Sequence, residues 1–197
     1  MMSNYSVFKV LLLSLALVGL VGCHVVDLDE NGEPIIPMSA ADAELLKNMT
    51  PNAIADKLWP SIKKDAQHNA VALSSIEKDS SVVSFVRFQG VVSRFDESKL
   101  KTSLVVNSAG YDIALQFGKI IKGNSIRDAA SMISFNQFKN QIQFAQLSKS
   151  LNKKAIAQVV KPDSSWVDQP VSVLAAVTIK ANKVMHAVPL EISKEGM

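Results

Sequence analysis

Cysteine is almost absent from this sequence, since Cys23 is the only one among 197 residues. A single thiol excludes an intramolecular disulfide, so packing of the core must hold the fold together. Histidine is scarce as well: His24, His68 and His186 stand far apart, without the spacing of a metal motif such as HxH or HExxH. No GxSxG sequence occurs, so serine-hydrolase chemistry has no support. We therefore expect no metal, no other cofactor and no enzymatic activity.

Long hydrophobic runs are also lacking. The apolar stretch at 10–21 has about 12 residues, which as a helix would measure about 18 Å. The hydrocarbon core of a bilayer is about 30 Å thick, so this stretch is too short for a permanent transmembrane helix. Its length suits the hydrophobic part of a secretory signal peptide, which we place at residues 1–22.

Cys23 follows this stretch directly, in the sequence Leu20-Val21-Gly22-Cys23. These residues resemble the lipobox of bacterial lipoproteins, in which an aliphatic residue and two smaller ones precede a cysteine. The resemblance implies that diacylglycerol is attached to the sulfur, that the chain is cut before the cysteine, and that the new amine is acylated. Two or more acyl chains anchor a protein stably, whereas one binds marginally. The alternative is an ordinary buried cysteine within a membrane anchor or signal.

The lipobox resemblance predicts a location in the bacterial cell envelope, on the periplasmic face, with the membrane as a partner through the N-terminal lipid. The residue after the cysteine is His24 rather than aspartate. In enteric-type sorting this resembles an outer-membrane destination, but the choice between outer and inner membrane stays open.

Strong charge of either sign is lacking too. Loss of residues 1–22 would remove one charged side chain, Lys9, and lower the formal net charge from +3 to +2. The lysine pairs at 63–64 and 153–154 are short and typical of solvated helix faces. A nucleic-acid-binding protein would concentrate Lys and Arg on one face, so we expect no nucleic-acid partner.

The chain after residue 22 is about the size of one domain. Residues 23–37 contain prolines and an Asn-Gly turn, and we interpret them as a lipidated tether. A calcium loop is not supported there, because Met38 stands where such a loop needs glutamate. We treat 38–197 as a single globular domain, made of a helical layer at 38–80 and a barrel at 81–197.

The helical layer shows a clear start signal. Thr50 can cap free backbone amides, and Pro51 at the first helical position loses no needed hydrogen bond. Apolar residues then follow with helical spacing, and Pro60 predicts a kink or break. We interpret Trp59 as a packing anchor rather than a ligand platform.

From residue 82 the apolar period changes to two, which is typical of strands. Turn sequences DESK and NSAG separate the first three strands, which predicts an antiparallel meander, and Gly90 suggests a bulge or tight coil in the first. Leu100 and His186 are expected on inward faces, and Pro189 places the last strand at an edge. The strands are predicted at 82–95, 100–106, 111–117, 171–179 and 184–192.

The segment 118–162 between the third and fourth strands is expected to be mostly helical. Its later part carries an apolar stripe that should plug a sheet or barrel end. Three strands, helices and then two strands is the order of an OB-type barrel. We therefore predict an α+β fold: an OB-like five-stranded antiparallel β-barrel with helices between strands 3 and 4 and an N-terminal helical layer. A plain α+β open sheet is the alternative.

Three stretches of the sequence resemble one protein family. They are VVDLDENGEPI after the predicted lipidation site, TPNAIADKLWPSI in the helical layer, and GKIIKGNSIRDAASMISFNQFKNQIQFAQLSKSLN. They are similar to the uncharacterised predicted periplasmic lipoproteins called domain of unknown function 2291. The resemblance covers nearly the whole chain after the signal and implies a membrane-anchored periplasmic protein, often encoded beside sugar ABC transport systems. No activity is established for that family, so the resemblance assigns no catalytic residue.

The third stretch also holds the candidate binding residues. Gly123 permits a positive φ or a close backbone approach, and Arg127 with Asp128 near a helix start offers a guanidinium and free amides to a polar or anionic group. The structural alternative is that Asp128 favours the helix N-terminus while Arg127 pairs with a carboxylate. Three amide side chains that either read sugar hydroxyls or cap the backbone complete the set: Asn136, Asn140 and Gln141.

The leading functional hypothesis is a membrane-anchored periplasmic lipoprotein that acts by binding and is accessory to a solute (sugar) ABC transport system. The second is direct capture of a small polar solute in the barrel mouth near Arg127. Single-strand nucleic-acid binding is the weakest, because it needs aromatic platforms and a basic groove. The oligomeric state stays open.

Overall fold

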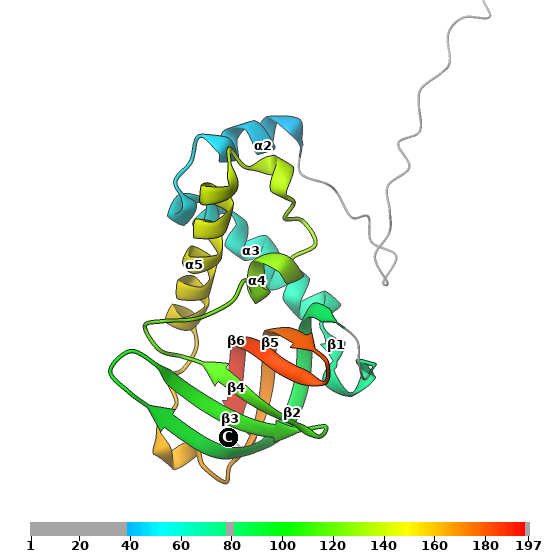
Figure 1. Cartoon of the computed structure of the whole chain (residues 1–197), viewed down its shortest axis with the longest axis vertical. Helices are drawn as coiled ribbons and strands as arrows, with labels where there is room; N and C mark the ends of the chain where they lie inside the picture. The colour runs from blue at the N-terminus through cyan, green and yellow to red at the C-terminus, as the bar shows by residue number, and fades with distance from the viewer. Residues whose placement is uncertain (1–38, 78–80, 196–197) are drawn as a thin grey trace, which may run out of the picture. The chain divides into compact units, whose positions relative to one another are not determined.

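The computed structural model describes residues 39–77 and 81–195, and these form one compact unit. A β-barrel occupies one end and a layer of helices the other (Figure 1). The predicted signal peptide, Cys23 and the whole of the predicted tether lie outside the described residues, as does Met38.

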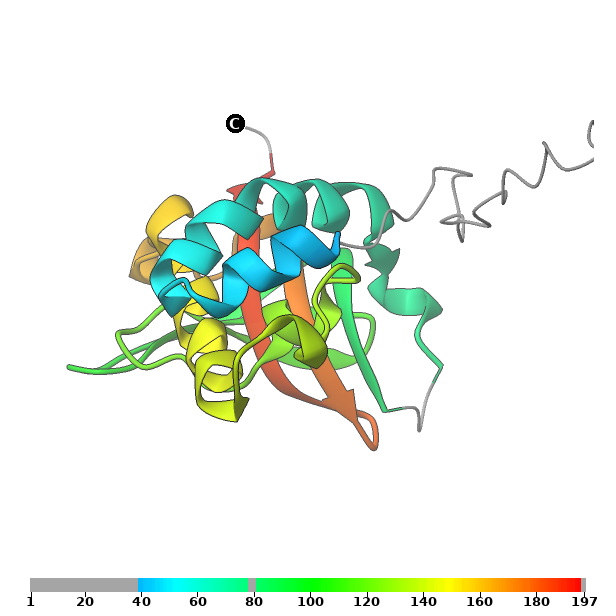
Figure 2. The same ribbon diagram turned by 90° about the horizontal axis from the view of Figure 1, so that it is seen from above.

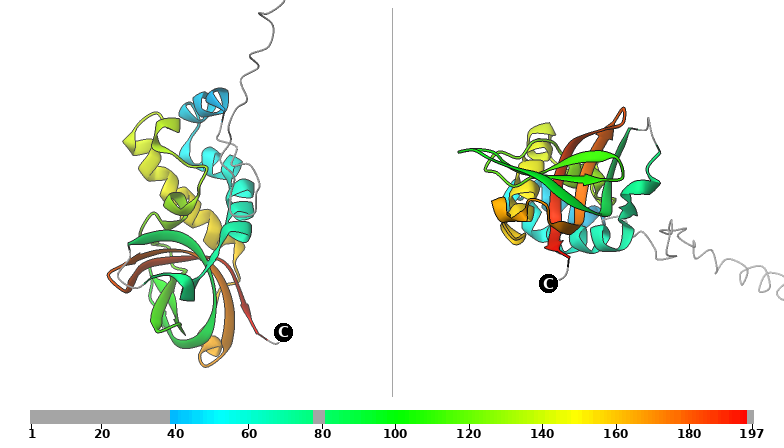
Figure 3. Two further views of the ribbon diagram at one scale, coloured as in Figure 1. Left: turned by 90° about the vertical axis from the view of Figure 1, so that its right-hand side faces the viewer. Right: turned by 90° about the horizontal axis from the view of Figure 1, so that it is seen from below.

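The barrel is closed by the long strand β2, which pairs with both β3 and β5. The sheet order is β1-β2-β3-β4-β6-β5, and β2 also pairs with β5, which completes the ring (Figure 3). This confirms the OB-like prediction, with two differences: β4 and β6 run parallel, paired through Leu115 and Ala187, and the two-residue strand β1 is added in parallel to β2. The strands are β1 Val71–Ala72, β2 Val82–Glu97, β3 Thr102–Ser108, β4 Tyr111–Gln116, β5 Pro170–Lys180 and β6 Lys183–Lys194.

Strand β2 changes partner near Gly90, where the prediction placed a bend. It pairs with β5 from Val82 to Val91, and with β3 from Val91 to Glu97. A Cβ on Gly90 would lie 2.4 Å from the backbone oxygen of Asn107. Glycine is therefore needed for the close approach of β3, and the register shift follows just after, beyond Val92.

The barrel interior follows the predicted period of two. Burial alternates along much of β2 and β4, whereas β5 and β6 are buried continuously at 173–177 and 187–190. Burial of these apolar side chains supplies the main driving force for closure. Leu100 is an exception: it lies in the β2–β3 loop and is 48 % exposed. The buried interior set includes Val86, Phe88, Val92, Leu104, Val106, Ile113, Leu115, Val171, Val173, Ala175, Val177 and Ile179.

Two long helices, α3 Pro51–Asn69 and α5 Gln141–Gln158, pack side by side and project from the barrel (Figures 1 and 2). Thr50 caps α3 as predicted, accepting a hydrogen bond from the Ala53 amide at 3.3 Å. The predicted break at Pro60 is wrong, because α3 continues through it. Apolar residues on both sides of the proline remain buried, and this packing outweighs the lost hydrogen bond.

Trp59 is a packing residue, as predicted. Its ring is buried, and the indole N–H donates to Gln158 Oε1 at 2.8 Å, which fastens α3 to the end of α5. Asp65 makes a second link, because its carboxylate accepts from the amide of Ser131 at 3.0 Å and from its hydroxyl at 3.1 Å. The helical layer is thus tied to the segment before α5 by polar as well as apolar contacts.

The segment 118–140 is less helical than predicted. It contains the five-residue α4 Ser125–Ala129 and the 3₁₀ turn η2 Phe135–Gln137, with irregular backbone between them. Gly123 has φ +89° and sits before α4, so the chain turns sharply there. Helix α4 packs against β2 and β5, whereas the apolar stripe of α5 packs against α3 and β6. The helix that covers the end of the barrel is therefore α4, and not α5 as predicted.

The remaining elements are short. They are α2 Ala40–Lys47, η1 Leu73–Ser75 and η3 Ser164–Trp166. The β5–β6 hairpin turns on two residues with positive φ, Ala181 and Asn182, as expected of a tight hairpin, and Lys183 already belongs to β6. The predicted edge position of the last strand is wrong, because β6 lies between β4 and β5 in the sheet. Pro189 is tolerated there because it pairs with Ala175 of β5, while the single pair between β4 and β6 lies at Ala187.

Candidate ligand-binding cleft on the barrel

Arg127 is buried between α4 and α5 and already has partners for its guanidinium. Nε donates to Asp128 Oδ1 at 2.7 Å, a second nitrogen lies 2.6 Å from the same oxygen, and Nη1 donates to the Phe144 carbonyl at 3.2 Å. The guanidinium also lies over the Phe144 ring, 3.8 Å from its centroid. This is the structural alternative considered for Arg127: it pairs with a carboxylate and joins α4 to α5.

The other residues predicted for binding are not brought to one place. Gly123 packs against the His186 ring, and its carbonyl accepts from Asn152 Nδ2 at 3.0 Å. Asn140 caps α5, accepting from the Gln143 amide at 2.9 Å. Asn136 and Gln141 are exposed at the far end of the helical layer. These residues therefore do not surround a common cavity with Arg127.

A cleft of about 340 Å³ opens instead on the outer face of the barrel, between β3, β4 and the start of β6. It exists because β4 and β6 are paired only at Leu115 and Ala187, so their ends diverge. The residues that line it are Lys101, Thr102, Ser103, Ala114, Gln116, Ile120, Lys122, Val184, Met185 and His186.

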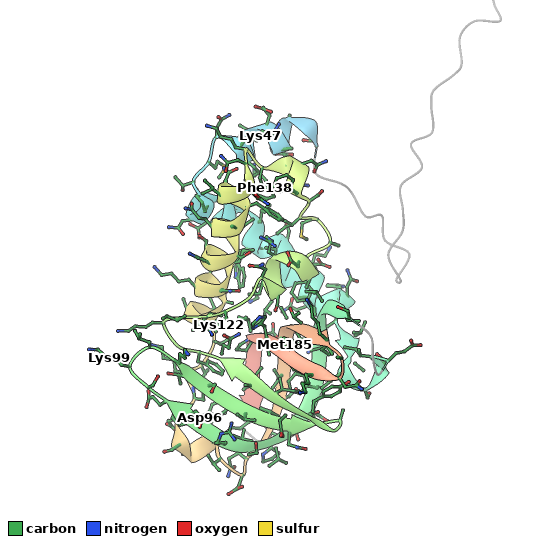
Figure 4. The ribbon with its side chains drawn as sticks, viewed as in Figure 1. Lys47, Asp96, Lys99, Lys122, Phe138 and Met185 are labelled. Atoms are coloured by element: carbon green, nitrogen blue, oxygen red, sulfur yellow. The ribbon has the colours of Figure 1, made fainter. Side chains whose placement is uncertain are left out.

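The wall formed by 117–122 is held by Gln116. Its Nε2 donates to the Lys122 carbonyl at 3.1 Å, and its Oε1 accepts from the Lys122 amide at 2.8 Å. Farther along, the Ile120 amide donates to the Leu100 carbonyl at 3.0 Å. The backbone beside the cleft is therefore fixed, while the side chains of Lys122 and Met185 remain exposed next to each other (Figure 4).

The cleft contains lysine side chains that can donate hydrogen bonds and that are not paired with a carboxylate among the described residues. Neither Lys101 nor Lys122 forms an ion pair in the part of the chain that the structure describes. The Ser103 hydroxyl and the half-buried His186 ring lie on the same lining, and Met185 adds an apolar rim. The strand pattern predicted His186 in the barrel interior. This prediction is wrong, because His186 lies at the barrel surface and lines the cleft. Such a lining can hold a small polar or anionic molecule.

A second, smaller cleft of about 230 Å³ adjoins the first through Thr102. It brings three more lysines to this end of the barrel: Lys99, Lys119 and Lys161, with Glu97 as the acidic residue of the lining. The sequence analysis missed this concentration, because the five lysines come from three separate segments. The available signal was the outward position of Lys101 and Ser103 in the alternating pattern of 100–106.

A family model, described as predicted periplasmic lipoprotein of domain of unknown function 2291, matches residues 13–193. The chain belongs to this family. Membership supports a membrane-anchored periplasmic protein, as the sequence resemblance implied. No protein of curated function matches the sequence.

A solved structure agrees with the fold assigned to this member of the family. A crystal structure of an OB-fold protein from Thermotoga maritima superposes with a TM-score of 0.54 at 16 % sequence identity. The match covers 76 % of this chain and all of the other. At this identity the likeness concerns the fold alone.

Two further features of this lipoprotein-family protein concern metal ligands and membrane-spanning helices. Within residues 39–77 and 81–195, no three His, Cys, Asp or Glu side chains are grouped so as to hold a metal ion. Over the same residues, no helix has the length and apolar composition needed to cross a bilayer.

Proposed function

We propose that this protein is a lipid-anchored periplasmic protein that acts by binding and assists a solute uptake system of the ABC type. Membership of a family of predicted periplasmic lipoproteins carries the proposal. Two features of the chain support it: the Leu20-Val21-Gly22-Cys23 sequence, suited to lipidation, and a barrel whose cleft has lysines without ion pairs among the described residues. We further propose that the solute carried by this transporter is a sugar.

Cys23→Ser should abolish lipid attachment, because the serine hydroxyl cannot replace the thiolate nucleophile that is alkylated by the diacylglyceryl group. In the wild type, mass spectrometry of the mature protein should give an N-terminal cysteine carrying glyceride and fatty acyl groups. The control Gly22→Ala keeps a small residue before the cysteine and should be processed normally. An unmodified thiol with an intact leader in the wild-type product contradicts the anchor.

The accessory role is tested by purifying the lipidated protein from its own membranes after mild cross-linking. Subunits of a solute ABC transporter should be enriched relative to an unrelated lipoprotein purified in the same way. Equal recovery from both purifications would remove the transport assignment while leaving the anchor intact.

The second candidate function is capture of a small polar solute. The Arg127 guanidinium is committed to Asp128 and Phe144, so we assign this function to the barrel cleft at Lys101, Lys122 and His186. Free amines there can bind carboxylate, phosphate or sugar hydroxyl groups.

Thermal unfolding of the mature protein against a panel of neutral and anionic sugars tests this second function. A ligand present at a hundred times its Kd stabilises the folded state by about 2.7 kcal/mol, which for a domain of this size raises Tm by about 5–10 °C. Lys101→Gln combined with Lys122→Gln should remove the shift. The control Lys63→Gln with Lys149→Gln removes two lysines outside the cleft and should preserve it. A flat response across the panel rejects solute capture.

A further inference from the structure

The end of the helical layer farthest from the barrel carries exposed apolar side chains. Leu45 in α2 is 56 % exposed, Phe135 in η2 is 51 % exposed, and Ile142 in the first turn of α5 is 68 % exposed. We call these three residues the helical tip. Single exposed apolar residues are common on protein surfaces, but a group of three at one end marks a site of contact.

Hydrogen bonds hold the parts of the helical tip together. Gln143 Nε2 donates to the carbonyls of Leu46 at 3.1 Å, Lys47 at 3.3 Å and Met49 at 2.8 Å, which joins the start of α5 to the end of α2. Phe135 packs edge-on against Phe144, with 5.3 Å between ring centroids, and η2 also packs on α2. Figure 4 shows Lys47 and Phe138 together at this end.

The acidic side chains beside the helical tip are neutralised. Asp42 lies 3.4 Å from Lys57, and Glu44 lies 2.9 Å from Lys47. Hydrogen bonding from the Ser39 hydroxyl, followed by Lys57, lowers the pKa of Asp42 and keeps it in this ionised pair. These carboxylates therefore present little net repulsion to an anionic surface.

Amide side chains separate the apolar ones. Asn136, Asn140 and Gln141 lie in sequence between Phe135 and Ile142 and are exposed, and so is Lys139. Apolar side chains flanked by amides and a lysine suit the boundary between lipid acyl chains and head groups, where each kind of group finds its preferred surroundings.

The chain itself brings the helical tip close to the anchor. Ser39 caps α2, the helix that carries Leu45, and Cys23 precedes Ser39 by about 16 residues. A chain of about 16 residues averages about 22 Å end to end as a flexible coil and reaches about 55 Å at most. Ser39, at the start of α2, is therefore the described residue that lies nearest to Cys23 along the chain.

We propose that the helical tip is a second membrane contact, in which Leu45, Phe135 and Ile142 enter the lipid interface beside the acylated Cys23. This rests on the proposed lipid anchor. Helix α3 runs from this end to the barrel, and its 19 residues measure about 28 Å. The contact therefore orients the body and holds the barrel cleft away from the bilayer, facing the periplasm.

Site-directed spin labelling tests the contact, since lipidation consumes the only native thiol. Ile142→Cys would provide a single labelling site in the lipidated full-length protein, reconstituted in vesicles of phosphatidylethanolamine and phosphatidylglycerol. The nitroxide at 142 should collide with oxygen several-fold more often, relative to a water-soluble nickel complex, than a label at Leu100→Cys. Leu100 is the matched control, because it is an exposed apolar residue on the barrel.

A variant with Leu45→Ser, Phe135→Ser and Ile142→Ser extends the test. Each of the three side chains is more than half exposed, so the fold should be retained although Phe135 loses its contact with the Phe144 ring; circular dichroism checks this. A label at Lys139→Cys should lie at the interface in the native background and move to water in the triple variant.

Three other outcomes would contradict the proposal, and they can be distinguished from one another. Equal accessibility at 142 and 100 in protein that still floats with the vesicles rejects the tip contact and keeps the anchor. Protein that fails to float rejects the anchor and the contact together. Shielding of the 142 label from both relaxants only when membrane proteins are added would make the occupant a protein.

Discussion

Gly90→Ala is expected to destabilise the barrel by about 3 kcal/mol, near the upper end of what overpacking costs. The added Cβ would lie 2.4 Å from the Asn107 backbone oxygen and 2.7 Å from Val106 Cγ1. The first neighbour is backbone in a paired strand, so it cannot move aside as a flexible side chain would. At about 2–4 °C per kcal/mol, Tm measured by circular dichroism should fall by about 6–12 °C.

Gly110→Ala is the matched control for this prediction. Gly110 has φ +81° in the β3–β4 turn, and a Cβ there would meet nothing within 4 Å. Its cost is backbone strain alone, about 1 kcal/mol. If the two variants lose equal stability, the close approach of β2 and β3 is not what requires glycine at residue 90.

Arg127→Ala is expected to destabilise the protein by about 2–3 kcal/mol, because it leaves Asp128 and the Phe144 carbonyl without their donor. The figure is below the full cost of breaking a buried pair, since the Asp128 side chain is 38 % exposed. Arg127→Lys keeps the charge but loses the double contact and should recover only part of the stability. Urea unfolding of the mature protein measures both variants.

Arg94→Ala provides the control, because Arg94 also pairs with a neighbouring aspartate, at 2.8 Å from Asp96, but at an exposed position. It should leave the urea midpoint unchanged. If Arg127→Ala also leaves the midpoint unchanged but alters solute binding, Arg127 is a ligand-binding residue after all and its assignment as a structural link is wrong.

The sequence predicted the barrel well because its strands are half-buried and alternate. The positions 86, 88, 92, 104, 106, 113 and 115 are buried as the period of two requires. The prediction of a break at Pro60 and the prediction of a mostly helical segment at 118–140 were wrong for one reason: packing outweighed the local signals. Pro60 lies in a helix that packing on α5 keeps intact, while Ile126, Ala130 and Phe138 are buried without a long helix around them.

The binding residues are harder to predict from the sequence than the strands. The sequence predicts binding by Gly123, Arg127 and Asp128. In the structure, Gly123 contacts His186, and Arg127 joins α4 to α5. The lysines of the barrel cleft carry no local motif. They come together only because three segments meet at one surface of the folded protein: β3, the segment after β4, and β6.

By itself the sequence determined what depends on neighbouring residues along the chain. The short apolar run before Cys23, the capped start of α3, the strand periods and the family resemblance can all be recognised in this way. Only the tertiary structure decided which lysines share a cleft, which arginine is already occupied, and which apolar side chains remain uncovered at the helical tip. These are properties of segments distant in sequence, and their surroundings exist only once the barrel has closed and α2, α3 and α5 have packed.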